Sequence, residues 1–147
     1  MTQDPVAFAF FNEIGIIDQL ISTMLTKCLP KGMTIAQFSV LNHFVRLEID
    51  EKSPAELASA FQVSRPTMTS TLARMEQAGL IAVRADPDDG RAKRVSLTEA
   101  GRAMRETCLA ATGTMVPILA PIASDAELEA LLPRLRKIRQ GLDALRD

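Results

Sequence analysis

Residues 53–98 constrain the fold of this 147-residue chain more than any other segment. Ser53 can cap a helix, the proline after it suits the first helical turn, and Glu56 completes a capping box with Ser53. After a brief break at Gln62-Val63, Ser64 can cap a second helix. Two short helices separated by a tight joint are typical of a helix-turn-helix motif, so we expect one here.

The second helix of this motif has two different faces. One face carries Met68, Leu72 and Met75, which recur at the three- and four-residue spacing of a buried helical stripe. The opposite face consists of small, hydroxyl-bearing and basic residues: Arg65, Pro66, Thr67, Thr69, Ser70, Ala73 and Arg74. Short side chains allow a helix to approach base edges closely, and arginine can bind guanine or phosphate. Taken alone, however, such a face is more typical of an ordinary solvated surface.

A basic hairpin follows this helix. The runs 80–85 and 92–97 are rich in Val, Ile and Leu and are predicted to be strands, and residues 86–90 (Asp-Pro-Asp-Asp-Gly) favour a turn. Four cations flank or occupy the hairpin: Arg84, Arg91, Lys93 and Arg94. An arginine at a loop tip can enter a narrow minor groove, where the negative potential is strongest. Because the three aspartates are unfavourable beside phosphate, we expect at least one of them to hold an arginine in place.

These features together predict a mainly α-helical protein with a small β-hairpin wing. The expected architecture is a winged helix-turn-helix lobe, with further helices at both ends of the chain. The tight joint before the recognition helix and the basic wing after it favour DNA contact over a solvated surface. A winged-helix module that binds another protein, without specific DNA binding, remains the alternative.

Several motifs in order resemble those of the MarR family (multiple antibiotic resistance regulators). The wing sequence DGRAKRVSLT, residues 89–98, is similar to the family signature D-x-R-x-x-x-V-x-L-T. The segment MTIAQFSVL, residues 33–41, is similar to the helix start L-T-x-x-Q-F-x-V-L. Further matches are SRPTMT at 64–69, Gly-Leu at 79–80 and TEAG at 98–101. The resemblance covers residues 33–104.

The resemblance implies a dimeric winged-helix transcription regulator that binds double-stranded, pseudo-palindromic operator DNA. It implies that Arg91 is the wing-tip arginine that enters the minor groove, and that Asp89 is the wing acid that holds it. The residues that we expect to contact DNA are Arg65, Thr67, Thr69, Ser70, Arg74, Arg91, Lys93 and Arg94. We expect a repressor whose half-sites lie about 10 base pairs apart, although an activator with the same DNA chemistry stays open.

Composition limits the kind of nucleic-acid protein that this chain can be. The net charge is -1, so any charge that favours DNA must be local. Residues 64–102 contain seven basic and five acidic residues, which predicts modest affinity per subunit and a strong dependence on salt. We expect no membrane-spanning segment, because no uninterrupted apolar run approaches about 20 residues, and no signal peptide. A cytoplasmic protein is therefore expected.

Helices are predicted at both ends of the chain. The pair Asp4-Pro5 is expected to open a helix that runs to about Leu29, and a helix from Thr98 is expected to run toward Met115. We expect the chain to break at Pro117 and Pro121. A capping box of Ser124 and Glu127 begins the last helix, which Pro133 is expected to kink or restart.

The apolar content of the terminal helices exceeds what a small lobe can bury. We therefore expect a two-fold homodimer held by Val6–Leu29 and Ala126–Leu145. The alternative is that these helices cover their own lobe. The corresponding division of the chain is a dimerisation helix (residues 1–32), a DNA-binding lobe (33–104) and C-terminal dimerisation helices (105–147).

A small-molecule effector is typical of the family that the chain resembles. Such a pocket would lie between the dimerisation helices and the DNA-binding lobe, and an apolar or aromatic ligand is expected. The candidate lining residues are Phe8, Phe11, Met24, Phe38, His43 and Met104. Each of them, taken singly, is more typical of a plain core position than of a ligand pocket.

Enzymatic chemistry is not expected. His43 is the single histidine, and no zinc-protease motif, glycine-rich phosphate loop or paired-carboxylate pattern is present. We expect no cofactor and no metal site, because one histidine and two separated cysteines do not readily form one. Peroxide-sensing relatives use a cysteine near the start of the first helix with supporting tyrosines, whereas Cys28 lies at its end and the chain has no tyrosine. Cys28 and Cys108 are therefore expected to be small buried hydrophobes.

Overall fold

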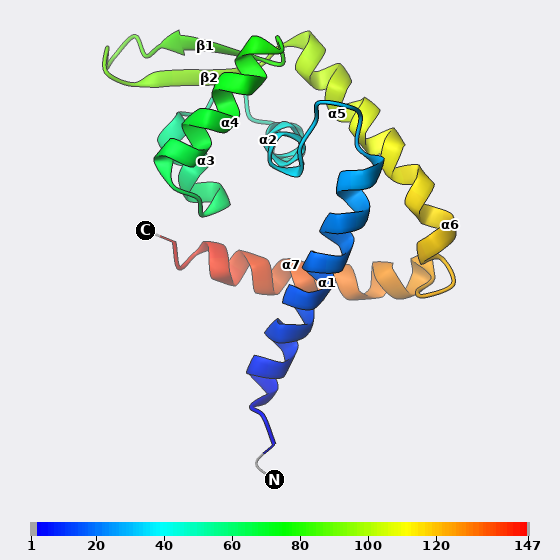
Figure 1. The fold of residues 1–147 in the computed structure, drawn as a ribbon. Helices are drawn as coiled ribbons and strands as arrows, with labels where there is room; N and C mark the ends of the chain where they lie inside the picture. Colours follow the sequence, from blue (N-terminus) through cyan, green and yellow to red (C-terminus); the bar gives the residue numbers. More distant parts are fainter. Residues whose placement is uncertain (1–2, 147) are drawn as a thin grey trace.

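The computed structural model describes residues 3–146 and is mainly helical, with one antiparallel hairpin (Figure 1). The elements are α1 (Val6–Cys28), α2 (Ile35–Arg46), α3 (Pro54–Phe61), α4 (Arg65–Gln77), β1 (Ile81–Ala85), β2 (Lys93–Leu97), α5 (Glu99–Ala111), the 3-10 turn η1 (Thr112–Met115), α6 (Val116–Leu119) and α7 (Asp125–Asp143). The predicted fold class and the predicted wing strands are confirmed.

The core lies inside the lobe formed by α2, α3, α4 and the hairpin. Its fully buried side chains include Leu41, Phe44, Leu57, Met75 and Val95. These residues come from four elements, α2, α3, α4 and β2, so burying them packs the two short helices and the base of the wing into one lobe. The lobe therefore positions the recognition helix and the wing relative to each other.

Helix starts follow local capping chemistry. The capping boxes predicted at Ser53 with Glu56 and at Ser124 with Glu127 are both formed. The Thr34 hydroxyl accepts from the Gln37 main chain at 3.2 Å while the buried Gln37 side chain accepts from the Thr34 main chain. Each box satisfies donors that a helix start leaves unpaired, so local sequence alone decides where these helices begin.

A tight joint connects the end of α4 to the start of α5. The Thr98 hydroxyl accepts a hydrogen bond from the Gly101 main chain at 3.0 Å and donates one to the Gly79 carbonyl at 2.6 Å. Gly79 itself has φ +75°, the left-handed conformation predicted for the end of the recognition helix. Gly101 lies against the Leu80 main chain, where a Cβ atom would overlap the Leu80 carbonyl. The joint thus explains why a threonine and a glycine stand three residues apart here.

Three expectations about helix ends are wrong. The chain does not break at Pro117, because η1 leads directly into α6 and places this proline in the first turn, where its missing N–H has no cost. Pro133 does not restart the last helix, since α7 is assigned as one helix with the proline inside. Asp4 does not cap α1 either: Pro5 occupies the N-cap position, and no side chain bonds there.

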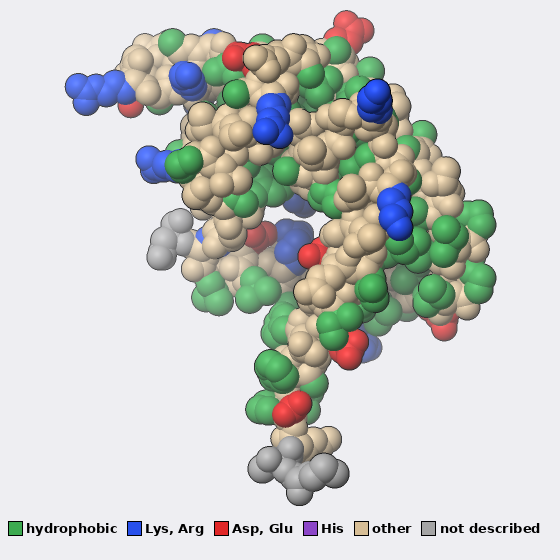
Figure 2. All heavy atoms as spheres, viewed as in Figure 1, with side chains coloured by type: hydrophobic (Ala, Val, Ile, Leu, Met, Phe, Trp, Pro, Cys, Tyr) green, Lys and Arg blue, Asp and Glu red, His purple; other side chains and the backbone are tan. Residues whose placement is uncertain are grey.

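Helices α1 and α7 bury none of their own residues completely. Large apolar side chains exposed on them and on α6 include Val6, Phe8, Ile17, Leu20, Ile118, Leu131, Leu135 and Leu142. Figure 2 shows such side chains on the projecting part of α1 and around α6. By length and mean hydropathy, α1 alone among the described helices is apolar enough to cross a membrane. This corrects the expectation that no segment of the chain is long and apolar enough. The core helix of a soluble protein can pass the same test, so the finding by itself does not indicate a membrane span.

The two cysteines differ in exposure. Cys108 is fully buried, and burial raises the pKa of its thiol, with the nearby Cys28 raising it further. Cys28 is half-buried, and its Sγ lies 3.7 Å from the Met115 Sδ. An apolar site that keeps a thiol protonated lowers its reactivity, which supports the packing role expected for Cys108.

His43 is half-buried on α2 and packs on Phe61, with ring centroids 5.1 Å apart. Burial is the main reason that its pKa lies below the ordinary value of 6.5. Three cations lower the pKa further, and one carboxylate partly opposes them: Arg46, Lys52, Arg146 and Asp143. The folded lobe therefore favours the neutral imidazole.

A lowered histidine pKa predicts a loss of stability in mild acid. As pH falls through about 6.5, the unfolded chain binds a proton that the folded chain resists, so the free energy of unfolding should decrease down to the folded pKa. We expect the melting temperature to fall between about pH 7 and pH 5.5 in the wild type and to fall less in His43→Gln. Calorimetry across this range measures both slopes; equal slopes would contradict the prediction.

Candidate nucleic-acid interface

Helix α4 presents the two faces that its spacing predicts. Met68, Leu72 and Met75 are buried against the lobe, between 0% and 5% exposed. The outward face is exposed at all of its predicted positions: Arg65, Pro66, Thr67, Thr69, Ser70, Ala73 and Arg74. The exposed side chains are short in the middle of the helix and basic toward its two ends. A double helix could therefore approach the backbone of α4 closely.

The joint before α4 fixes how the recognition helix leaves α3. Gln62 adopts a left-handed conformation, with φ of 52°, and reverses the chain direction within the joint. Ser64 then caps α4 by accepting from the Thr67 main chain at 3.2 Å, and its hydroxyl donates to the Thr67 hydroxyl at 2.8 Å. The first turn of α4 contains no acidic residue, so the positive end of its dipole is not neutralised by its own chain.

The wing is a regular antiparallel hairpin closed by aspartates. Ile81 pairs with Leu97 at its base. The Asp86 carboxylate accepts from the Asp88 main chain at 2.9 Å, and the Asp89 carboxylate accepts from the Arg91 main chain at 3.0 Å. The pKa of Asp86 is lowered, first by the hydrogen bond from Asp88. Two of the three aspartates thus shape the turn through main-chain bonds.

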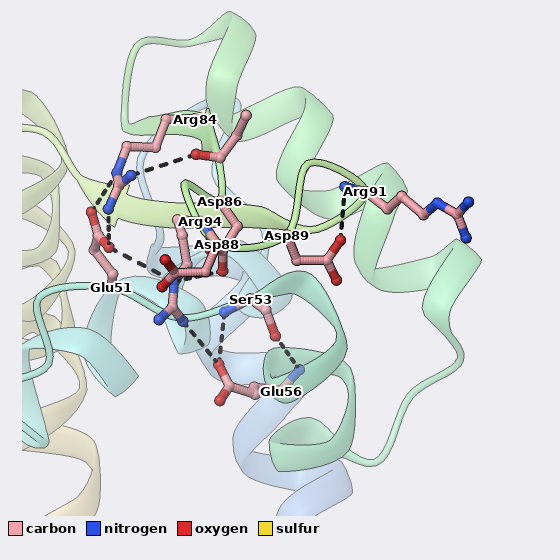
Figure 3. Close-up of polar contacts among 10 residues, drawn as sticks. Glu51, Ser53, Glu56, Arg84, Asp86, Asp88, Asp89, Arg91 and Arg94 are labelled. Atoms are coloured by element: carbon pink, nitrogen blue, oxygen red, sulfur yellow. Dashed lines mark hydrogen bonds and ion pairs between the residues drawn. The ribbon is translucent and has the colours of Figure 1, made fainter.

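Asp89 contacts Arg91, but not in the way that the resemblance implies. Its carboxylate binds the main-chain N–H of Arg91, whereas the guanidinium extends away from the wing (Figure 3). The aspartate of the wing turn that lies beside an arginine side chain is instead Asp86, whose Oδ2 lies 3.4 Å from Arg94 Nε. Asp89 can therefore orient the peptide that carries Arg91 and leave the guanidinium free to reach a partner.

A cleft of about 480 Å³ separates the wing from α4. Its lining comes from the start of α3, from the outward face of α4 and from the wing: Ser53, Pro54, Ala55, Arg65, Thr69, Leu72, Ala73, Glu76, Val83, Asp89, Arg91, Ala92, Lys93 and Val95. Three cations line the cleft against two acids. Figure 2 shows lysine and arginine side chains on the hairpin and on the neighbouring α4. The arrangement suits a polyanion that contacts both elements at once.

Not all wing cations are free to contact such a partner. Arg84 binds the Glu51 carboxylate with two hydrogen bonds, of 2.8 and 2.7 Å. Arg94 lies near three carboxylates, those of Asp86, Glu51 and Glu56 (Figure 3). Arg91 and Lys93 have no side-chain ion pair among the described residues. The DNA contact expected of Arg94 stays a prediction, because its guanidinium lies among carboxylates of its own chain.

The candidate effector residues do not surround one cleft in the described chain. Phe8 and Phe11 are 59% and 45% exposed and lie on the part of α1 that projects away from the lobe (Figure 1). Met104 packs against the core, and His43 stacks on Phe61. The residues that line the cleft beside α4 include none of the six.

Comparison with known proteins identifies the arrangement. A family model described as the MarR family matches residues 31–92. A probable transcriptional regulator from Pseudomonas aeruginosa is 31% identical, covering 92% of this chain and 97% of that chain with a TM-score of 0.68. MarR from E. coli in its apo form is 26% identical, covering 94% and 98% with a TM-score of 0.75.

A MarR mutant from E. coli complexed with operator DNA is also 26% identical, and here 88% of this chain and 93% of that chain are covered, with a TM-score of 0.71. The matches extend over the terminal helices as well as the winged lobe. The chain belongs to the MarR family of winged-helix, DNA-binding transcription regulators.

Proposed function

We propose that this chain is a homodimeric repressor that binds a pseudo-palindromic operator. Each α4 enters a major groove, and each wing places Arg91 in the flanking minor groove. The observation that carries the proposal is the exposed face of α4, which stands across a cleft from Arg91 and Lys93 of the wing. The complex of a 26% identical MarR mutant with operator DNA supports operator binding by this fold.

Within this interface the residues have different tasks. Thr69 and Ser70 are short and central on α4, so we assign them to base edges, where a thymine methyl or a hydrogen-bond acceptor can be read. The charged and capping positions are assigned to phosphates, which set the register of the helix: Arg65, Thr67, Arg74 and Lys93. Sequence preference should therefore follow the middle of α4, and affinity should follow its ends and the wing.

The dimer is proposed from the exposed apolar surface of the terminal helices. Helix α7 leaves Leu131 52% and Leu135 42% exposed, and α1 leaves Leu20 64% exposed. Large exposed apolar patches mark interaction sites, and we infer that a second copy of the chain covers this one. We therefore divide the chain into a dimerisation helix (1–32), a DNA-binding lobe (33–104) and C-terminal dimerisation helices (105–147). This interface explains why α1 is both long and apolar. We place the regulator in the cytoplasm, because its proposed partner is DNA.

Introducing charge into α7 tests the dimer. Leu131→Asp combined with Leu135→Asp would bury four unpaired carboxylates per dimer, so we expect the protein to become monomeric at micromolar concentration. Sedimentation velocity measures the change, and operator affinity should fall with it because two half-sites no longer bind together. Lys137→Asp, on the polar side of the same helix, should remain dimeric. A monomeric wild type would refute the interface.

A small apolar or aromatic effector is the last part of the proposal. Phe38, His43 and Met24 are half-buried on α2 and α1, near the contact between the dimerisation helix and the lobe. A ligand bound there would change the separation of the two recognition helices. A shift of a few ångströms would then break the register with both half-sites, which lie about 10 base pairs apart.

Fluorescence anisotropy with the DNA upstream of the chain's own coding region tests the function. We expect saturable binding of one dimer per site, with an affinity that falls steeply with salt, and weaker binding to a shuffled sequence. Candidate effectors are then added to the preformed complex. If neither this DNA nor fragments selected from the genome bind above the shuffled level, the protein-interaction alternative replaces the proposal.

A further inference from the structure

The linker between α2 and α3 runs along the base of the wing. Lys52 forms a β-bridge with Val95 of β2, with main-chain hydrogen bonds of 3.0 and 2.8 Å. These two bonds and the burial of Ile81 and Val95 hold the base of the hairpin in the lobe, whereas none of residues 84–94, which form the outer part of the ribbon, is fully buried. Because such a ribbon is marginally stable by itself, other contacts must hold its direction.

The residue before this bridge, Glu51, supplies a second attachment. Its two carboxylate oxygens accept separate hydrogen bonds from Nε and Nη2 of Arg84 on β1, at 2.8 and 2.7 Å. Two parallel bonds restrict the orientation of the guanidinium as well as its position. The same carboxylate lies 3.9 Å from Arg94 Nε on β2, so Glu51 contacts both strands of the wing.

Arg94 continues the connection from the wing into the helix-turn-helix. It lies 3.4 Å from the Asp86 carboxylate in the wing turn and 3.9 Å from the Glu56 carboxylate on α3 (Figure 3). Glu56 in turn accepts from the Ser53 main chain at 2.8 Å in the capping box that starts α3. A continuous chain of contacts therefore leads from the wing turn to the first helix of the motif.

These contacts affect the distance between the wing and the recognition helix, both of which are proposed to contact DNA. Helix α3 packs on α4, so whatever fixes the wing relative to α3 also fixes the width of the cleft between Arg91 and α4. The wing tip lies several residues beyond the attachment, and each strand residue adds about 3.3 Å of length. A small rotation at the base is therefore a larger displacement at the tip, where the minor-groove contact is proposed.

We propose that Glu51 and Arg94 are positioning residues that hold the wing at the angle needed for its minor-groove contact, and that Glu51 strengthens DNA binding despite its negative charge. The inference rests on the proposed function of the wing. The cluster has two arginines and three carboxylates, so it adds no net positive charge. Its contribution must come through geometry.

Because Glu51 is negatively charged, the two interpretations of this residue predict opposite changes in operator affinity when its charge is removed. If Glu51 is only a surface acid near the DNA, Glu51→Gln removes repulsion and operator affinity rises by about twofold. If it positions the wing, affinity falls by about five- to tenfold, and the salt slope flattens as the wing contact is lost. Asp50→Asn is the matched control, because it makes the same charge change at the preceding, exposed residue.

A second measurement needs no DNA. Trypsin can cleave the wing after Arg91 and Lys93, so the initial rate of cleavage there reports how well the wing is held. We expect faster wing cleavage in Glu51→Gln and in Arg84→Gln than in the wild type or Asp50→Asn. The double variant should be no faster than Glu51→Gln alone, because Arg84→Gln removes only a contact that the loss of the Glu51 carboxylate has already removed. Unchanged melting temperatures would confirm that the lobe itself remains folded.

The two measurements separate the possible failures. Weaker operator binding together with faster wing cleavage in Glu51→Gln supports the positioning role. Unchanged cleavage overturns it, whatever the DNA assay shows, as does an affinity that rises as in Asp50→Asn. A wild type that binds no operator refutes the proposed function. In that case the rate of wing cleavage by trypsin still tests whether Glu51 holds the hairpin in place.

Discussion

Replacing Gly101 with alanine is expected to lower the free energy of unfolding by about 3 kcal/mol or more. The added Cβ atom would overlap the main-chain carbonyl of Leu80, which is held in place by a hydrogen bond from the Thr98 main chain at 3.1 Å. A main-chain atom cannot rotate away as a flexible side chain can. Relief therefore requires α5 to separate from the end of the recognition helix and opens the core around Leu80.

Urea denaturation followed by circular dichroism measures this effect. Gly141→Ala is the matched control: nothing lies within 4 Å of a Cβ atom built at this position on α7, so helix propensity should make the change stabilising by up to about 1 kcal/mol. If Gly101→Ala shifts the urea midpoint no more than this control does, the close approach of α5 to Leu80 is wrong.

Replacing Arg91 with alanine is expected to weaken operator binding by about ten- to a hundredfold without changing stability. Its guanidinium is exposed and extends from the wing, so no packing is lost. In a dimer both wings lose the contact, and the slope of log affinity against log salt should decrease by about 2. The loss should be similar on different operator sequences, because an arginine in a narrow groove reads shape rather than base edges.

Two controls interpret the Arg91 result. Lys137→Ala removes the same charge from α7 and should leave affinity nearly unchanged, which excludes a general charge effect. Thr69→Ala should instead alter which operator sequence is preferred. Anisotropy titrations on a small set of operator variants distinguish these patterns, and an Arg91→Ala variant with wild-type affinity and salt slope would refute the wing assignment.

The parts of the fold that sequence predicts correctly depend on neighbouring residues. The capping box of Ser53 and Glu56 involves residues three positions apart, and the left-handed Gly79 ends a helix through its own backbone freedom. The alternation of buried and exposed residues on α4 is likewise local. Such features require no knowledge of the tertiary structure, so a single sequence suffices to find them.

The features that the sequence does not predict are of two kinds. Some depend on contacts between residues far apart in the chain, and others depend on which of two local conformations a residue adopts. Glu51 pairs with Arg84, 33 residues along the chain, and nothing in the linker sequence marks it as a partner of the wing. The sequence likewise shows the charge of Arg94, from which DNA contact is predicted, but not its three carboxylate neighbours. Pro117 illustrates the second case: a proline ends a helix when it is internal and starts one when it is in the first turn, and sequence did not show that α6 begins there.

The division of labour along α4 has a consequence for how such regulators diversify. Residues that hold the helix in the lobe, such as Met68 and Leu72, alternate with residues that face outward, such as Thr69 and Arg74. Operator preference can therefore change through mutations that leave the scaffold intact, and one lobe can be retargeted to new promoters during evolution. Residues on the outward face of α4 can therefore be substituted with little effect on the fold, whereas Thr98 and Gly101 cannot.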